Sequence, residues 1–464
     1  MLDLICTNNF CCSLLMFYSL VDKIIKEIET TENRKRSRNQ EAKENFKFTL
    51  EHLLKDLWKS SRSIPPSQIA VNLRTAYYSE NNRYLDSRLT YRQMIAALTG
   101  LENVGLIKLV SKGYFSRERR DGKLTRYSPT PLLLEQLNLI QSHPAIFFKD
   151  EVPIQPIILR HNVDGKRQDN NHYSDTPSSV VYRSNLQKIN DCLIKHWVDL
   201  RIKDKEIPLL AERVFQDEDK EPIDLSRRTL VRIFTNGSFE EGGRFYRAWW
   251  QNVPSEYRPY ITIDEEVTTE YDYSQLSPHM LYFSEGKDLG NEDAYDRVLD
   301  GQHRDVVKQA FNAMVQSRRV LTRSPKKIDL SSVDFDWKTL RDRILEAHKP
   351  IQHLFFKGKG NQLQFWDSCM AESIMLHFAA QNEPVLPIYD SFIMRQGYAS
   401  ELEEVMRKAF RDKFGNDIRI KAELIVEREA LYDADGRPRI EAVTKDDREH
   451  SQWYDRNTDW LYHK

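Results

Sequence analysis

The chain has 464 residues, of which 40% are hydrophobic and 30% are charged, and its formal net charge is −1. This is an ordinary soluble composition, and because one core rarely exceeds about 250–300 residues we expect about two to four domains. The balanced charge gives no indication of nucleic-acid binding. The five cysteines include no CxxC pair, which argues against a structural zinc site or a disulfide framework and favours a reducing cytoplasm.

Residues 1–45 form an N-terminal helical and charged segment. The apolar run Phe10–Val21 has no Lys or Arg before it. It is too short to cross a bilayer and lacks the basic start of a signal peptide, so it is either a buried first helix or a misassigned start. No other segment could cross a membrane. The charge run Glu29–Glu44, centred on Arg34–Arg38, favours a solvated helix or tail over a phosphate contact.

Residues 46–150 show the pattern of a winged helix-turn-helix domain. Thr90 is a good N-cap for a helix that Gly105 ends, and Leu106–Val110 follows as a strand. Asp121-Gly122 then indicates the turn of a hairpin. Helix, strand and basic hairpin in this order resemble the winged-helix family.

The hairpin is rich in cations, namely Arg117, Arg119, Arg120, Lys123 and Arg126. Such a wing would lie along DNA phosphates while the preceding helix enters a groove. A winged helix that mediates dimerisation or protein docking is the alternative.

Residues 151–180 are interpreted as a linker, because Arg160–Asn171 contains almost nothing apolar and Thr176-Pro177-Ser178-Ser179 follows. Beyond this point strands and helices are mixed. The fold class is therefore α+β.

Three segments of the C-terminal half carry residues suited to catalysis. A strand runs to an exposed tip at Asp272, and Asp390 lies in the apolar strand pattern Val385–Ile393, where a lone carboxylate is costly without a partner or metal. Between them, one helix face presents a residue of interest every four positions: Arg304, Lys308, Asn312 and Gln316.

Together these residues are the minimum apparatus for nucleotidyl transfer. Asp272 and Asp390 can hold two divalent ions, Mg²⁺ or Mn²⁺, that activate a 3′-hydroxyl and clamp a triphosphate. Arg304 and Lys308 would supply fixed positive charge to the phosphates. Asp367 or Glu372 could add to the metal site.

Four motifs, in the right order, resemble those of the family-A DNA polymerases. Asp272-Tyr273-Ser274-Gln275-Leu276-Ser277 is similar to that family's Asp-Tyr-Ser-Gln-Ile-Glu, and Arg304 with Lys308 matches its Arg-x3-Lys. Gly243-Arg244 and Gln251-Asn252-Val253-Pro254 match an upstream pair. Tyr389-Asp390-Ser391-Phe392 is closer to the His-Asp-Ser-Phe of the related phage-type single-subunit RNA polymerases.

The resemblance implies a right-hand-like architecture, with a thumb-like helical region at 181–240, a palm with compact fingers at 241–430 and a C-terminal tail at 431–464. It implies that Asp272 and Asp390 are catalytic metal ligands. It assigns nucleotide binding to Arg304, Lys308, Asn312, Ser277, Tyr273 and Gln275. It assigns primer-template contacts to Arg244, Gln251, Gln316 and Tyr389.

Departures from the family pattern concern the choice of sugar. Ser277 stands where the DNA enzymes have a Glu that helps to block the ribose 2′-hydroxyl, and Asn312 replaces an aromatic ring. Both changes predict relaxed sugar selection. Gln316 replaces a tyrosine near the templating base.

The sequence thus predicts a template-directed nucleotidyltransferase, a DNA polymerase or primase-like polymerase, whose partners are DNA and nucleoside triphosphates and which a winged helix recruits to DNA. The alternative is a non-catalytic DNA-binding replication or regulatory protein with a degenerate palm. A metal-dependent nuclease is a third interpretation, which only the two acids support.

Overall fold

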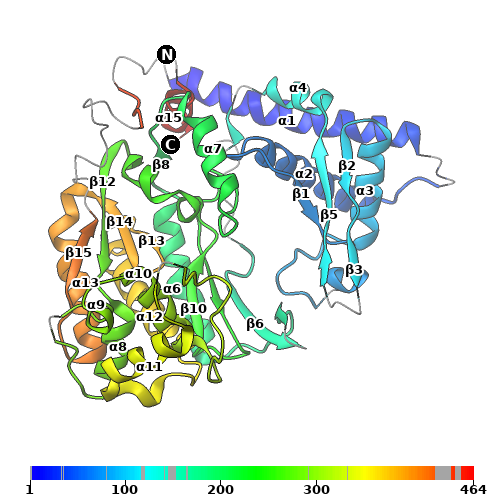
Figure 1. Ribbon diagram of the computed structural model, residues 1–464. Helices are drawn as coiled ribbons and strands as arrows, with labels where there is room; N and C mark the ends of the chain where they lie inside the picture. Colours follow the sequence, from blue (N-terminus) through cyan, green and yellow to red (C-terminus); the bar gives the residue numbers. More distant parts are fainter. Residues whose placement is uncertain are drawn as a thin grey trace.

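The structure is a computed structural model, and it describes residues 3–32, 34, 36–79, 81–116, 121–140, 142–144, 153–163, 166–290, 292–331, 333–423, 440–444 and 451–463. The described residues bury two separate hydrophobic cores. One core is built from residues 17–140 and the other from residues 157–440. Figure 1 shows the N-terminal body on one side of the molecule and the larger, mixed α+β body on the other.

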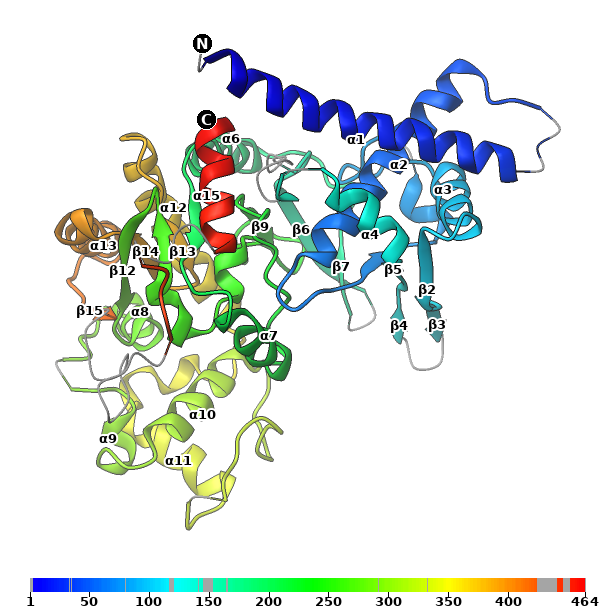
Figure 2. The same ribbon diagram turned by 90° about the horizontal axis from the view of Figure 1, so that it is seen from above.

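The N-terminal body packs helices around a three-stranded antiparallel sheet of order β1-β5-β2. Its helices are α1 (Asp3–Thr31), α2 (Gln40–Ser61), η1 (Thr75–Tyr78), α3 (Tyr91–Asn103) and α4 (Pro131–Asn138). Its strands are β1 (Ile69–Val71), β2 (Ile107–Ser111), β3 (Tyr114–Ser116), β4 (Asp121–Lys123) and β5 (Thr125–Pro129). β3 and β4 pair as a hairpin that extends away from the helices (Figure 2).

Local signals around α3 are confirmed. The Thr90 hydroxyl accepts a hydrogen bond from the Gln93 amide, which caps the helix, and Gly105 follows it with φ +73°. Glycine adopts this left-handed conformation without steric cost. The apolar run near the N-terminus lies in α1, which buries Phe17 and Val21 but leaves Leu15 63% exposed. The first helix is therefore buried along one face.

The expectation of a turn at Asp121-Gly122 is wrong. Asp121 and Gly122 are strand residues of β4, paired with Ser116 and Phe115 of β3, so the turn is not there. The cations Arg117, Arg119 and Arg120 lie outside the described residues.

The charge run Glu29–Glu44 is expected to be solvated, but one of its residues, Arg38, is buried. Its side chain is only 2% exposed, it pairs with Glu29 and Glu32, and it lies 3.7 Å from the Phe46 ring centroid. An arginine with an apolar stem and a planar head can be buried when acids and a ring satisfy it.

The segment 151–180, expected as a linker, contains a β-hairpin. β6 (Ile157–Val163) and β7 (Lys166–Asp169) form a hairpin in a four-stranded sheet of order β10-β9-β6-β7, with β9 (Val231–Phe234) and β10 (Gly242–Tyr246). Ile157 and Leu159 reach the core, whereas Asn162 and Arg167 are exposed. A hairpin at the edge of a sheet has few buried positions, so its composition resembles that of a linker.

The second sheet is antiparallel, with the order β13-β14-β12-β11-β8, and β15 pairs with the last residues of β12. Its strands are β8 (Val198–Leu200), β11 (Ile261–Ile263), β12 (Glu266–Tyr273), β13 (Leu386–Ile388), β14 (Ser391–Arg395) and β15 (Ile420–Glu423). β8 and β9 show that residues 181–240 are not purely helical, because both strands complete sheets of this body.

Helices surround these sheets. They are α6 (Pro177–Leu193), α7 (Glu206–Gln216), α8 (Leu276–Ser284), α9 (Asp296–Leu299), α10 (Arg304–Gln316), α11 (Trp337–Ala347), α12 (Gly360–Ala379), α13 (Ala399–Phe414) and α15 (Gln452–His463). Short 3₁₀ turns connect them, namely η2 (Trp249–Asn252), η3 (Ser255–Tyr260), η4 (Lys349–Leu354) and η5 (Gln396–Tyr398). α12 packs against α6, α13 and β10. Within the described residues, no helix combines the length and the apolar character needed to cross a membrane.

The C-terminal helix α15 joins the two bodies, although a tail is expected for residues 431–464. Arg456 of α15 makes a bidentate ion pair with Asp199 of β8, at 2.8 and 3.0 Å. On the N-terminal side, α15 contacts α1, and Asp459 accepts a hydrogen bond from the His143 amide. The helix is visible between the two bodies in Figure 2.

A buried histidine in the helical part of the second body makes its stability depend on pH. His348 is fully buried, its Nε2 lies 3.0 Å from the Ala294 carbonyl oxygen, and its Nδ1 lies 3.1 Å from the Tyr282 hydroxyl. Burial, followed by the nearby Arg297 charge, lowers its pKa from 6.5 to about 4. The neutral ring is therefore the form that the fold stabilises.

We expect this histidine to make the protein less stable in acid. Because its folded pKa lies below its unfolded one, its contribution is complete above pH 6.5 and is lost as the pH falls towards 4, by on the order of 3 kcal/mol. Urea unfolding between pH 7 and pH 4 measures this loss, which should be smaller in His348→Gln. Equal losses in both proteins would contradict the assignment.

Candidate active site

The central hairpin places the two aspartates side by side. Asp272, near the end of β12, is the cross-strand partner of Ser391 in β14. Asp390 directly precedes Ser391, in the two-residue turn between β13 and β14, and its neighbour Tyr389 has φ +58°. The sequence pattern suggested that Asp390 lies within a strand. In the structure it lies in a hairpin turn. Both aspartates line one cavity of about 430 Å³.

α10 forms another wall of this cavity. All four of its predicted residues, spaced at intervals of four, line the cavity: Arg304, Lys308, Asn312 and Gln316. The four residues therefore share one helix face, as their spacing predicts.

The two cations of α10 differ in their surroundings. Arg304 donates to Asp293 at 2.8 Å, and this hydrogen bond raises the pKa of Arg304. Lys308 is exposed, and no carboxylate among the described residues lies within ion-pair distance of it. Of the two cations of α10, Lys308 is thus the more available to an anionic ligand.

The junction of β12 and α8 supplies a third wall. Ser277, in the first turn of α8, and Gln275 both line the cavity. Gln275 adopts φ +54°, and its side-chain oxygen accepts a hydrogen bond from the Ala294 amide. Gln275 therefore fixes this junction to the segment that precedes α9, and this contact occupies its side-chain oxygen.

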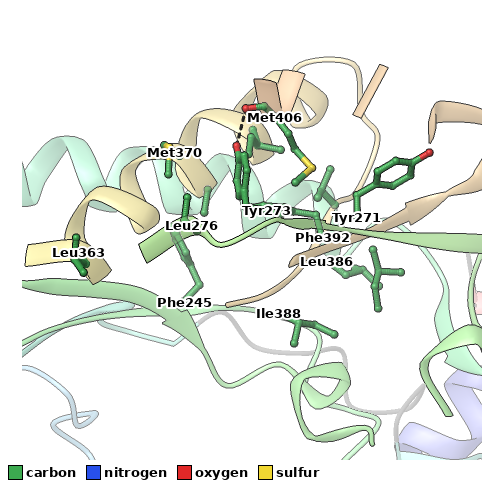
Figure 3. Packing of buried hydrophobic residues seen from close by; sticks show 14 of the residues in the cluster. Phe245, Tyr271, Tyr273, Leu276, Leu363, Met370, Leu386, Ile388, Phe392 and Met406 are labelled. Atoms are coloured by element: carbon green, nitrogen blue, oxygen red, sulfur yellow. Dashed lines mark hydrogen bonds between the residues drawn. The ribbon is translucent and has the colours of Figure 1, made fainter. Parts of the chain in front are cut away.

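Tyr273 lines the cavity, but its ring is directed into the core. Its side chain is 2% exposed and its hydroxyl donates to the Met406 carbonyl at 2.6 Å. Figure 3 shows this bond and the ring among the core residues, with Phe392 close by. Side chains alternate between the two faces of a strand, so the residue that follows Asp272 is directed into the core.

Arg244 and Asp367 form a charged pair beside the aspartates. Arg244 lines the cavity, donates to Asp367 at 2.7 Å, and lies 5.6 Å from the Tyr389 ring centroid. Asp367 is 1% exposed, and burial, opposed by Arg244 and reinforced by Asp390, raises its pKa to about 7. Burial disfavours the charge of Arg244, but Asp367 and Asp390 outweigh it and raise the pKa of Arg244. Arg244 therefore interacts with two acids: it donates a hydrogen bond to Asp367 and is also stabilised by the negative charge of Asp390.

Gln251 and Glu372 do not reach the cavity. Gln251 is 7% exposed and donates to the carbonyl oxygens of Phe245 and Pro387, so its predicted contact with nucleic acid is wrong. Its amide instead satisfies two buried backbone carbonyls beside the hairpin. Glu372 pairs with the buried Arg232 at 2.9 Å, which removes it as a metal ligand.

Lys421 and Tyr295 also line the cavity, and neither was predicted. Lys421 of β15 is the cross-strand partner of Asp272 on the side away from β14. A strand at 419–427 is recognisable in the sequence, but its register against β12 is not. Register places a cation beside an acid, and it depends on pairing between distant segments.

The carboxylates present suit a magnesium ion that relies on its substrate for other ligands. Within the described part of the chain, no group of three or more His, Cys, Asp or Glu side chains could hold a metal ion. Glu270, two residues before Asp272, is occupied by Arg258 and Ser391. Mg²⁺ is commonly bound through one or two carboxylates together with water and substrate phosphates, so Asp272 and Asp390 fit that role.

The wing residues lie away from this cavity. Lys123 and Arg126 are exposed, on β4 and β5 of the N-terminal body.

No published family model matches the chain, and no match is found among curated proteins. Among solved structures there is a likeness to the POL domain of Pol1 from M. smegmatis, in complex with DNA primer-template and dNTP, at 10% identity and a TM-score of 0.31. It covers 82% of this chain and 65% of that one, so this chain spans slightly less than two thirds of that domain.

Proposed function

We propose that the protein is a template-directed nucleotidyltransferase that extends a nucleic-acid primer and uses Asp272 and Asp390 as its metal-binding acids. The observation that carries the proposal is the content of one cavity. Asp272 of β12, Asp390 of the β13–β14 turn, the available cation Lys308 and the small residues Ser277 and Asn312 all line it. A nuclease needs the acids but has no use for a cationic helix beside them.

In this function each wall of the cavity has its own task. Asp272 and Asp390 would hold two magnesium ions, which lower the pKa of the attacking 3′-hydroxyl and stabilise the leaving pyrophosphate. Lys308 and Arg304 bind the triphosphate and offset the charge that develops on it. Asp293 orients Arg304 in advance, so less conformational freedom is lost on binding.

The N-terminal body would recruit the enzyme to duplex DNA as a winged helix. α2, β1, α3 and the β2–β5 hairpin follow one another in the order that this family has. α3 would enter a groove, and exposed Lys123 and Arg126 would contact phosphates.

The proposal is tested by measuring whether the protein incorporates dNTPs, NTPs or both, and how Ser277→Glu changes that choice. Extension of a labelled primer on a DNA template, with dNTPs and NTPs in separate reactions, should give template-dependent products in both. Ser277→Glu places a larger side chain where a 2′-hydroxyl would lie. It should lower the ratio of NTP to dNTP incorporation by at least about tenfold, equal to about 1.4 kcal/mol.

Ser284→Glu is the matched control, because Ser284 is an exposed residue at the end of the same helix and does not line the cavity. Its incorporation ratio should equal that of the unmodified protein. Strong rejection of NTPs by the unmodified protein, with no further change in Ser277→Glu, would refute the role of Ser277.

A further inference from the structure

A second, larger cavity lies between the two bodies, away from the aspartates. It has a volume of about 800 Å³. Residues that follow β1 and residues of the β3–β4 hairpin line it from the N-terminal body, and β7 lines it from the other. We call it the interbody groove. Figure 2 shows β6 and β7 facing the strands of the N-terminal body.

The groove is cationic. Arg74, Lys123 and Arg167 line it and are exposed. Asp169 is the one acid among its described lining residues, and Arg160 pairs with it at 2.8 Å. The described lining therefore carries a net positive charge that an anionic polymer would neutralise.

Aromatic and apolar side chains are also exposed in the groove. Tyr77 is 36% exposed, Tyr114 is 53% exposed and Leu124 is 44% exposed, and all three line the groove. Exposed aromatic rings in the same groove as cations suit a single strand whose bases can stack on protein and whose phosphates meet positive charge. Bases in a duplex already stack on one another, so such rings would contribute little to duplex binding.

The two walls of the groove are fixed to each other. The Tyr84 hydroxyl accepts from the Leu159 amide and donates to the Asn170 carbonyl, so it ties the N-terminal body to β6. Arg83 donates to the Tyr173 carbonyl and to Asp175. The buried Asn82 donates to the Tyr77 carbonyl at 2.7 Å, which holds the backbone of an aromatic groove residue in place. A preformed groove loses little freedom when a ligand enters it.

From this geometry we propose that the interbody groove binds single-stranded nucleic acid, with Tyr77 and Tyr114 stacking on bases and Arg167 contacting phosphates. The site is separate from the cavity of the aspartates. Its binding does not require that the aspartates catalyse anything.

Fluorescence anisotropy of labelled 12-nucleotide oligomers, single-stranded DNA, single-stranded RNA and a DNA hairpin duplex, tests the proposal with the full chain. Tyr77→Ala and Tyr114→Ala should each weaken single-strand binding by about tenfold. Arg167→Ala should weaken it and lower the slope of log K against log salt by about 0.7. Duplex binding should change little, and comparison of the DNA and RNA oligomers identifies the natural strand.

Tyr18→Ala is the matched control, because Tyr18 is an equally exposed tyrosine on α1 outside the groove. It should bind as the unmodified protein does. Unchanged single-strand affinity in the Tyr77→Ala/Tyr114→Ala double variant would overturn the proposal, and so would an equal loss of duplex binding. Because the readout is binding, a failure here is distinguishable from a failure of primer extension.

Discussion

Replacing Asp390 by asparagine is expected to lower the rate of nucleotide incorporation by about 10³-fold, and Asp272→Asn should do the same. Each change keeps the shape of the side chain and removes the charge that a divalent ion requires. Asp272 lies opposite Ser391, the residue that follows Asp390, so the two acids occupy different positions at one edge of the site and neither can replace the other. Single-turnover primer extension at saturating magnesium measures the rate.

The same variants should still bind nucleotide and DNA. Lys308 and Arg304 are on α10, which carries neither aspartate, so both cations remain in place. Asp412→Asn is the control, since Asp412 forms an exposed ion pair with Lys408 on α13. Its rate should match that of the unmodified protein. Retention of full activity in Asp390→Asn would show that the hairpin acid has no catalytic role.

Replacing Arg456 by methionine is expected to destabilise the protein by about 3–5 kcal/mol. Arg456 and Asp199 are 7% and 1% exposed, so the change leaves a buried carboxylate without its main partner. Burial already raises the pKa of Asp199, with Arg456 opposing that shift. Urea unfolding followed by circular dichroism measures the loss, which should also include the docking of α15.

Two further variants separate the buried pair from general effects of the substitution. Arg213→Met breaks an exposed pair with Glu256, which water and salt already screen, and should change the stability little. Adding Asp199→Asn to Arg456→Met removes the stranded charge and should restore part of the stability. Equal losses in Arg213→Met and Arg456→Met would contradict the importance that we assign to the buried pair.

The sequence predicted those parts of the site that depend on local spacing. Arg304 to Gln316 form one helix face because four-residue intervals bring side chains to the same side of any α-helix. Thr90 and Gly105 delimit a helix by hydrogen bonding and by backbone conformation, which are local as well. Such features can be derived without knowledge of the rest of the fold.

Features that depend on long-range pairing could not be predicted. A motif match gave roles to Gln251 and Tyr273 but could not show that both side chains are directed to the interior. Lys421 reaches the cavity through the register of β15 against β12, and a one-residue shift would direct it to the opposite face. The β6–β7 hairpin has the composition of a linker because an exposed edge of a sheet needs few apolar residues.

The central claim is most directly tested by single-nucleotide addition on four primer-templates that differ only in the first unpaired template base. We predict that, with magnesium, the unmodified protein adds the nucleotide complementary to that base on each template, and that Asp390→Asn adds none. Addition that does not follow the template base, shortening of the primer, or no addition by protein that binds both DNA and nucleotide would contradict the claim.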